Sequence, residues 1–165
     1  MATTKKPAAT AAAAKTDATA LLERDHRDVK KLFKQYEKLA DAEASGEERQ
    51  ALATQICTML TVHATVEEEI FYPAAREAEV DDDLLNEAEV EHASAKDLIA
   101  QIESMSPDDE LYDAKVTVLG EYIDHHVQEE EGEMFPKCRR AKMDLAGLAQ
   151  ELAERKSELM ADTPT

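Results

Sequence analysis

The stretch HATVEEEIFYP, residues 63–73, has a counterpart in the second half of the chain, HVQEEEGEMFP, residues 126–136. One His, two Glu, an aromatic residue and a Pro occupy the same positions in both. A second pair of segments, DHRDVKKL at 25–32 and EHASAKDL at 91–98, shares an acid, a His, a Lys and a Leu. Such internal similarity is the signature of a repeated structural unit. We therefore predict that each half is a helix pair, with one His on its first helix and an HxxxE motif on its second.

Apolar residues around these segments recur at intervals of three and four, which is typical of amphipathic helices. Pro73 is expected either to kink or to end the second helix. The expected helices cover residues 19–41, Glu47 to about Ile70, a segment capped by Asp81–Asp83 that runs to Ile102, a segment that starts at 106–109 and runs to Glu130, and a shorter one from Leu145 to Met160.

Long helices joined by short loops predict an all-α protein, an up-down-up-down antiparallel four-helix bundle. The composition agrees, because Gly and Pro are scarce and Trp is absent from the 165 residues. A chain of this length is expected to form one core. We divide it into a basic, disordered tail at 1–18, the bundle at 19–140, and a short C-terminal helix and tail at 141–165.

The formal net charge of -18 disfavours nucleic acid and anionic membrane surfaces as partners, because phosphates would be repelled. The same charge attracts cations. No stretch approaches the roughly 18 apolar residues of a membrane helix, and the tail lacks the core of a secretory signal. We expect a cytoplasmic protein in which Cys57 and Cys138, without CxxC partners, are reduced thiols.

Residues four apart lie on one face of a helix, so His63 with Glu67, and His126 with Glu130, can bind the same ion. His26 and His92 lie in the middle of apolar stripes. Burying carboxylates without partners costs several kcal/mol each, and cations would neutralise them. The predicted metal ligands are His26, His63, Glu67, His92, His126 and Glu130.

Imidazole and carboxylate donors without thiolate suit iron, manganese or zinc, whereas calcium prefers oxygen throughout. A carboxylate on each side of the bundle can bridge two ions, so we expect a two-metal centre. We favour two iron ions, which can change oxidation state, over manganese or zinc.

These segments, with DHRDVKKLF, EH and HHVQEEEGEMFP, resemble the hemerythrin-like, or HHE cation-binding, family over roughly residues 19–140. The resemblance implies a four-helix bundle with a non-haem di-iron centre. It further implies that His26 and His63 bind one iron, that His92 and His126 bind the other, and that Glu67 and Glu130 bridge them.

One position departs from the oxygen-carrying hemerythrins, which have a further His one turn after the His of the third helix. Here that residue is Lys96. The missing imidazole argues against reversible oxygen carriage and implies a more open centre, as in HHE proteins linked to iron or oxygen sensing, nitric oxide or peroxide. The expected partner is a small diatomic ligand or peroxide, and the chain is expected to be a monomer or homodimer.

Several alternatives remain open at this point. His125 competes with its neighbour His126 as a ligand, and Tyr122 either faces the metals or is packed. A ferritin-like scheme would pair Glu23 with His26 and Glu89 with His92. The other acids of the two Glu runs are expected on a solvated face: Glu68, Glu69, Glu129 and Glu131.

The leading functional hypothesis is a di-iron protein that binds or senses oxygen, nitric oxide or iron, for example in a stress response. The second is a di-iron enzyme that degrades peroxide, like a catalase or peroxidase. The third is a metal-free acidic helical scaffold.

Overall fold

The computed structural model describes residues 17–163, so most of the predicted basic tail lies outside the described residues. All regular structure within 17–163 is helical. The elements in chain order are α2 (Ala18–Asp41), α3 (Gly46–Val66), η1 (Glu67–Phe71), α4 (Tyr72–Glu77), α5 (Asp82–Ser104), α6 (Tyr112–Glu129), η2 (Glu130–Met134), α7 (Phe135–Arg140) and α8 (Leu145–Asp162).

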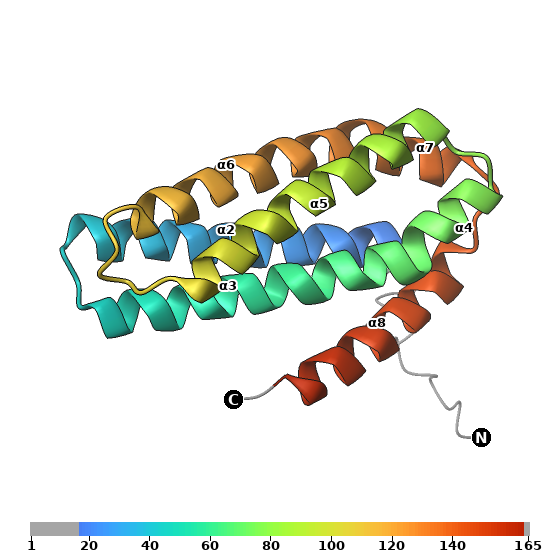
Figure 1. Cartoon of the computed structure of the whole chain (residues 1–165). Coiled ribbons are helices and arrows are strands. Elements are labelled where there is room, and N and C mark those ends of the chain that lie inside the picture. The colour runs from blue at the N-terminus through green and yellow to red at the C-terminus, as the bar shows by residue number, and fades with distance from the viewer. Residues whose placement is uncertain (1–16, 164–165) are drawn as a thin grey trace, which may run out of the picture.

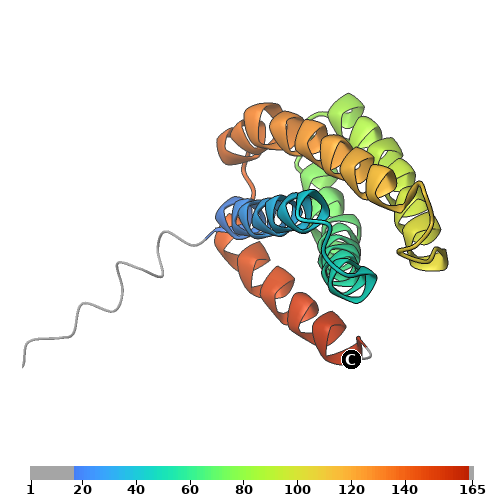
Figure 2. The same ribbon diagram turned by 90° about the vertical axis from the view of Figure 1, so that its left-hand side faces the viewer.

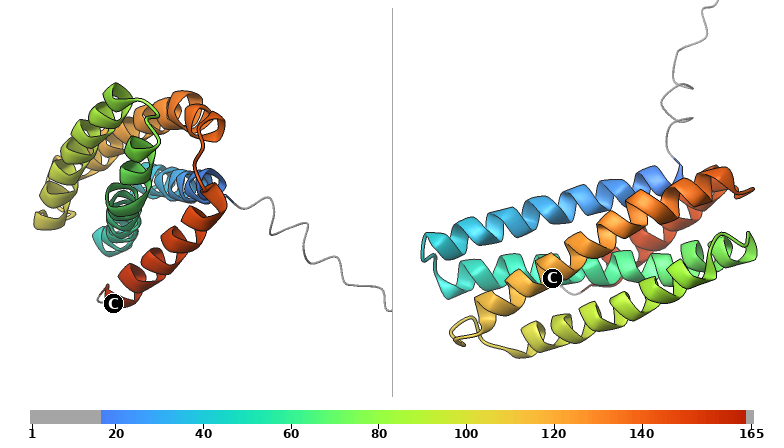
Figure 3. Two further views of the ribbon diagram at one scale, coloured as in Figure 1. Left: turned by 90° about the vertical axis from the view of Figure 1, so that its right-hand side faces the viewer. Right: turned by 90° about the horizontal axis from the view of Figure 1, so that it is seen from above.

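The predicted antiparallel bundle is confirmed: α2, α3, α5 and α6 are its four long helices (Figure 1). Helix α2 forms one hairpin with α3, and α5 forms the other with α6. Helix α8 packs against α2, α3 and η1, on the side of the first hairpin that faces away from the second (Figures 2 and 3). The C-terminal helix therefore covers one half of the bundle only.

Polar side chains cap four of the described helices, and Asp144 caps α8 through the Gly147 amide at 3.0 Å. Asp17 accepts a hydrogen bond from the Ala20 amide at 2.9 Å, and Asp81 accepts one from the Leu84 amide at 3.2 Å. Ser45 does the same for α3. Such caps satisfy amides that the first helical turn leaves without partners.

The fourth helix begins later than predicted. Residues 106–111 form turns, and α6 starts only at Tyr112. The Asp109 side chain accepts from the Ser106 amide at 2.9 Å, and its carbonyl accepts from the Tyr112 amide at 3.1 Å. The acids after Pro107 therefore stabilise a turn and do not cap an α-helix.

The second and fourth helices each contain one π-helical turn, η1 and η2. The amide of Tyr72 donates to the Glu67 carbonyl, a bond to the fifth residue back in the chain. Pro73 follows directly, and Pro136 follows the equivalent turn in η2. Proline has no amide hydrogen for an α-helical bond, and the wider turn lets the chain continue past it. The helix therefore does not end at Pro73.

Two apolar clusters fill the bundle. One, near η1 and η2, contains Leu22, Phe71 and Phe135, and Leu152 of α8 joins it. The other, toward the α2–α3 loop, is built around residues such as Ile56. On each of the four long helices a histidine falls between members of the two clusters, so a polar layer separates them. None of the helices within 17–163 combines the length and apolar character that crossing a membrane requires.

Candidate metal centre

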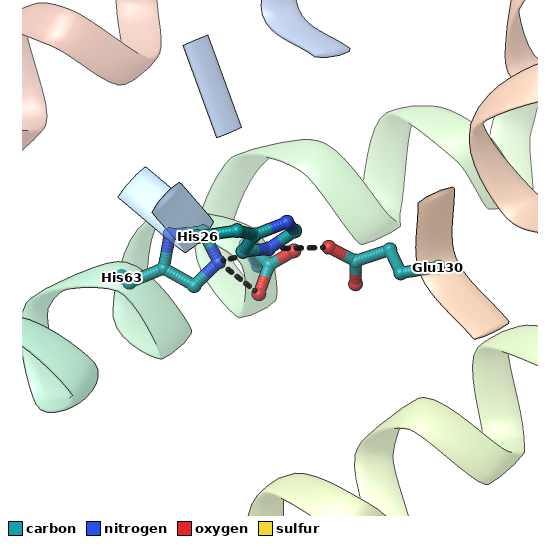
Figure 4. Close-up of side chains that lie close together, drawn as sticks. His26, His63 and Glu130 are labelled. Carbon is teal, nitrogen blue, oxygen red and sulfur yellow. Dashed lines mark hydrogen bonds and ion pairs between the residues drawn. The ribbon is translucent and has the colours of Figure 1, made fainter. Parts of the chain in front are cut away.

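The polar layer contains all six residues predicted as metal ligands. Five are nearly inaccessible to solvent, with the two glutamates at 0% and 1% exposure, and the His63 side chain is 11% exposed. Figure 4 shows three of them, His26, His63 and Glu130, which come from different segments and direct their polar atoms toward one another. The structure brings together Glu67, His92, His126 and these three.

The four histidines form two pairs whose Nε2 atoms face each other. His26 Nε2 lies 3.1 Å from His63 Nε2, and His92 Nε2 lies 3.3 Å from His126 Nε2. Each pair joins a histidine from the first helix of a hairpin to one from the second. The pairing is the one that the family resemblance implies for the two metal positions.

Each glutamate contacts one histidine of each pair. Glu67 Oε1 lies 3.1 Å from His63 Nε2 and 3.3 Å from His92 Nε2. Glu130 Oε1 lies 3.3 Å from His26 Nε2, and its Oε2 lies 3.1 Å from His126 Nε2. A carboxylate between two imidazole pairs is the arrangement that bridging two cations requires.

Several of these buried oxygens lack hydrogen-bond partners. Although histidine nitrogens lie 3.1 to 3.3 Å from them, Glu67 Oε1 and Glu130 Oε1 make no contact with hydrogen-bond geometry in the described chain, and Glu67 Oε2 makes none either. Leaving such groups unpaired is costly, and most buried polar atoms in proteins do have partners. Bound cations would satisfy them, so the donor set fits a metal centre of imidazole and carboxylate ligands.

Acids also lie on the outer nitrogens of the histidines. His63 Nδ1 lies 3.0 Å from Asp25, and His126 Nδ1 lies 3.1 Å from Glu91. His26 Nδ1 lies 3.0 Å from Glu131. Acids in this position are typical of metal-binding histidines, because they fix the ring so that Nε2 faces the metal.

The two Glu runs are less uniformly solvated than predicted. The Glu131 side chain is 37% exposed, and its contact with His26 also places it beside the centre. Glu68 is half-buried and accepts two hydrogen bonds from Lys96, at 2.6 and 2.7 Å. Glu69 is exposed, as predicted, and pairs with Arg155 of α8 at 2.8 Å.

The acids raise the pKa of two of the histidines. Burial alone would lower the pKa of His63, but Glu67 and Asp25 outweigh it and raise this pKa to about 10. Burial would also lower the pKa of His126, but Glu130 and Glu91 outweigh it and raise this pKa to about 11. Without metal these two imidazoles are therefore protonated at neutral pH. Cations must displace those protons in order to bind.

Sequence reasoning missed Tyr72. Its hydroxyl donates to Glu130 Oε2 at 2.6 Å and lies 3.2 Å from His92 Nε2. Burial, followed by the charge of Glu130, raises its pKa well above the ordinary value, so the phenol stays protonated and is a donor. The repeat offered a signal, because it aligns Tyr72 with another aromatic residue, Phe135. The Phe135 ring stacks on His26, with 6.1 Å between the ring centroids.

The structure also decides between the alternatives. His125 is exposed and His126 is buried in the cluster. Tyr122 is 47% exposed, so it does not pack in the core, and it lines a cavity together with the four histidines.

The ferritin-like scheme has no support in the geometry. Its two additional acids point away from the centre. Glu23 pairs with Arg139 at 2.7 Å, and Glu89 pairs with Arg76 at 3.2 Å.

Both thiols, Cys57 and Cys138, are buried and free.

A cavity of about 320 Å³ borders the polar layer. All four histidines line it, and its other walls are largely apolar, with Val29, Leu60 and Ile99 among them. Four charged residues, Asp25, Glu91, Lys96 and Lys156, also line it, so the cavity offers a small molecule a mostly apolar space beside the histidines.

Helix α8 contacts this region through Met160, which lines the cavity, and through a half-buried ion pair. Lys156 donates to Asp25 Oδ1 at 2.5 Å, while Asp25 Oδ2 lies beside His63. Lys156 also lines the cavity. The C-terminal helix thus takes part in orienting a histidine of the centre.

A four-helix bundle with this buried His and Glu layer defines a class of metal-binding helical proteins. The sequence matches the model of the hemerythrin HHE cation-binding domain over residues 17–138. The chain therefore belongs to the hemerythrin HHE cation-binding domain family, which confirms the resemblance noted from the sequence.

Two individual proteins are also similar to the chain. A hemerythrin HHE cation-binding domain-containing protein from Mycobacterium kansasii has the same fold, with a TM-score of 0.73 over 88% of each chain and 24% identity. A DNA nickase from Nostoc sp. is 31% identical over 115 residues, which are 70% of this chain. The aligned region spans 31% of that protein, so the chain corresponds to about a third of it.

Proposed function

We propose that the chain is a non-haem di-iron protein that binds or senses a small ligand, oxygen or nitric oxide, at the centre formed by the six buried residues. The observation that carries this proposal is the position of Glu67 and Glu130. Each lies between the two histidine pairs, and each has buried oxygen without a hydrogen-bond partner. When bound, a pair of irons would supply redox chemistry and coordination positions for such a ligand.

The side chain of Lys96 supports an open centre. It occupies the position where oxygen-carrying hemerythrins have a further histidine, and its ammonium binds Glu68. Lys96 therefore adds no donor to the His92–His126 pair and leaves that side to the cavity. This arrangement favours ligand sensing over reversible oxygen carriage.

Peroxide degradation is the second candidate, and Tyr72 is the observation that favours it. A protonated phenol 2.6 Å from Glu130, facing the same polar layer as the cavity, can hydrogen-bond a peroxide oxygen or supply a proton. The name of the Nostoc relative supports no nickase activity for this chain. It covers about a third of that protein, and a net charge of -18 disfavours phosphate backbones.

One titration separates the two candidates. Iron-loaded protein is mixed with nitric oxide under anaerobic conditions, and separately with hydrogen peroxide, while the near-ultraviolet spectrum and evolved oxygen are recorded. A binding protein gives a saturable spectral change with nitric oxide and no sustained peroxide consumption. Continuous peroxide turnover that Tyr72→Phe reduces and that Tyr112→Phe, in the apolar cluster toward the α2–α3 loop and outside the cavity lining, does not reduce would establish the enzyme. A chain that gives neither response contradicts both.

A further inference from the structure

The two halves of the repeat differ in what lies outside the centre. Asp25 and Glu91 occupy equivalent positions, and each contacts Nδ1 of an HxxxE histidine. The free oxygen of Asp25 is bound by Lys156 of α8. The free oxygen of Glu91, in the half that α8 does not cover, lies 3.7 Å from His125 Nε2. A cation covers one acid, and an exposed histidine faces the other.

Glu91, His125 and Glu129 form a group that we call the outer cluster. His125 Nε2 lies 3.2 Å from Glu129 Oε1, and the three side chains are 21%, 65% and 36% exposed in chain order. His125 and Glu129 have the HxxxE spacing, one residue before the buried pair. The equivalent residues of the first half are Val62 and Val66, both buried, so these two donors are not part of the repeat.

A small void lies between two residues of the outer cluster, Glu91 and Glu129, and the centre. Its volume is about 10 Å³, and Glu91 and Glu129 line it together with the buried His126 and Glu130. A space of roughly this size holds one water molecule. Glu130 is 1% exposed, and its Oε1 has no hydrogen-bond partner. The void is also lined by the apolar side chains of Leu84, Ala88 and Met134. It lies between the half-buried carboxylates of Glu91 and Glu129 and the buried Glu130, whose Oε2 accepts from Tyr72 and whose Oε1 remains without a partner in the described chain.

We propose that Glu91, His125 and Glu129 form an outer divalent-cation site, which captures the ion and passes it to His126 and Glu130. One imidazole and two carboxylates suit Fe²⁺, Mn²⁺ or Zn²⁺. The exposed position makes the ion exchangeable, and the net charge of -18 raises the local concentration of cations. Capture stands on the outer cluster alone, and transfer rests on the proposed function of the buried centre.

The transfer is tested by the loading rate of metal-free protein with Co²⁺, followed by stopped-flow visible absorbance. The variant His125→Ala, Glu129→Gln is expected to load roughly tenfold more slowly or worse, because focused electrostatic attraction raises on-rates by about 10 to 1000. After desalting, which removes the exchangeable ion of the outer site, the final amount of Co²⁺ per chain is expected to be the same in both. Glu121→Gln, which removes one exposed charge from the same helix, is the control and should load at close to the wild-type rate.

Capture is tested separately by nuclear magnetic resonance. The chain is incubated with Zn²⁺, desalted, and given a small amount of Mn²⁺, and broadening of the His125 ring signals is measured. We expect broadening at His125 that Glu129→Gln abolishes. Broadening without any Co²⁺ uptake into the buried centre would support the outer site and contradict the proposed function. Unchanged His125 signals, or an outer-cluster variant that loads as fast as wild type, would overturn this proposal.

Discussion

The histidine rings of the centre have acids near both of their nitrogen atoms. The inner nitrogens of the histidines face Glu67 or Glu130, while the outer nitrogens of three of them contact Asp25, Glu91 or Glu131. The inner acids are candidate ligands, and the outer acids set the ring orientation. Both roles follow from which nitrogen of the imidazole each acid faces.

Removing an outer acid should weaken metal binding without removing a ligand. We expect Asp25→Asn to lower the affinity for Zn²⁺ by roughly 10 to 100-fold, because His63 loses the group that orients it. Competition against a chromophoric chelator measures this. Asp41→Asn, at the exposed end of the same helix, is the control. Equal affinities for the two variants would mean that Asp25 has no influence on the centre.

The Tyr72 hydroxyl should stabilise the metal-free chain. Tyr72→Phe removes the donor to the buried Glu130 carboxylate, and hydrogen bonds to charged groups contribute about 1.5 to 3 kcal/mol. Urea unfolding of metal-free protein should show a loss in that range. Tyr122→Phe, at an exposed position, should change the free energy of unfolding by less than about 0.5 kcal/mol. A neutral Tyr72→Phe would show that the contact with Glu130 contributes nothing.

The protonated histidines make the stability of the metal-free chain depend on pH. The pKa values of His63 and His126, about 10 and about 11, exceed the unfolded value of about 6.5. The folded state therefore binds more protons between these limits, and its stability falls as pH rises. Both histidines contribute to this fall, which spans the range between the unfolded pKa and each folded-state pKa. Denaturant unfolding at several pH values measures it.

The variant His63→Gln is the comparison for this slope. It should unfold with a shallower pH dependence than wild type over the same range, because one of the two extra protons is gone. The stabilising contribution of each histidine is complete below about pH 6.5 and disappears through its folded-state pKa. Stability that rises from pH 7 to 9 in the metal-free protein would contradict the assignment.

At the scale of the element, the π-helical turns explain why the HxxxE pairs could be predicted from the sequence and why Tyr72 could not. The HxxxE pairs lie at α-helical spacing, so their shared face was predictable. Tyr72 lies five residues after Glu67, which an α-helix would place on another face. Only the wider turn of η1 brings both to the centre. The proline after each π-helical turn was visible, but its effect on the turn was not.

The first residue of α6 could not be predicted from the sequence, for a different reason. A Ser-Pro-Asp-Asp sequence suits a helix cap and a turn equally well, because Asp and Ser side chains bind nearby amides in both. The chain uses Asp109 in a turn, and α6 begins at Tyr112. Local sequence alone could not choose, since the choice depends on how the loop packs against the first hairpin. There, Arg49 donates to the Pro107 carbonyl at 3.2 Å.

Helix α8 is expected to unfold together with the bundle. Leu152 is 0% exposed within the apolar cluster near η1 and η2, so Leu152→Ala should cost about 2 to 5 kcal/mol. Met160→Ala, on the exposed part of the helix, should cost far less. Thermal unfolding followed by circular dichroism measures both. A separate early transition in the Leu152→Ala variant would show that α8 is an independent unit.

At the scale of the whole molecule, two similar hairpins meet at one polar layer. Repetition in the sequence identified the six residues of that layer, because each half repeats the same donors at the same spacing. The difference between the two hairpins could not be predicted from the repeat. Helix α8 covers only the first hairpin, where Lys156 binds Asp25, and it leaves the outer cluster of the second hairpin open.

The central claim is that the six buried residues hold two metal ions. Its most direct test is the metal content of protein purified from iron-supplemented cells and desalted, together with its near-ultraviolet spectrum. We predict two irons per chain with charge-transfer bands, both lost in the variant His126→Ala, Glu130→Ala. A desalted wild-type chain without iron, and without uptake of any metal on reconstitution, would contradict the account and leave an acidic helical scaffold.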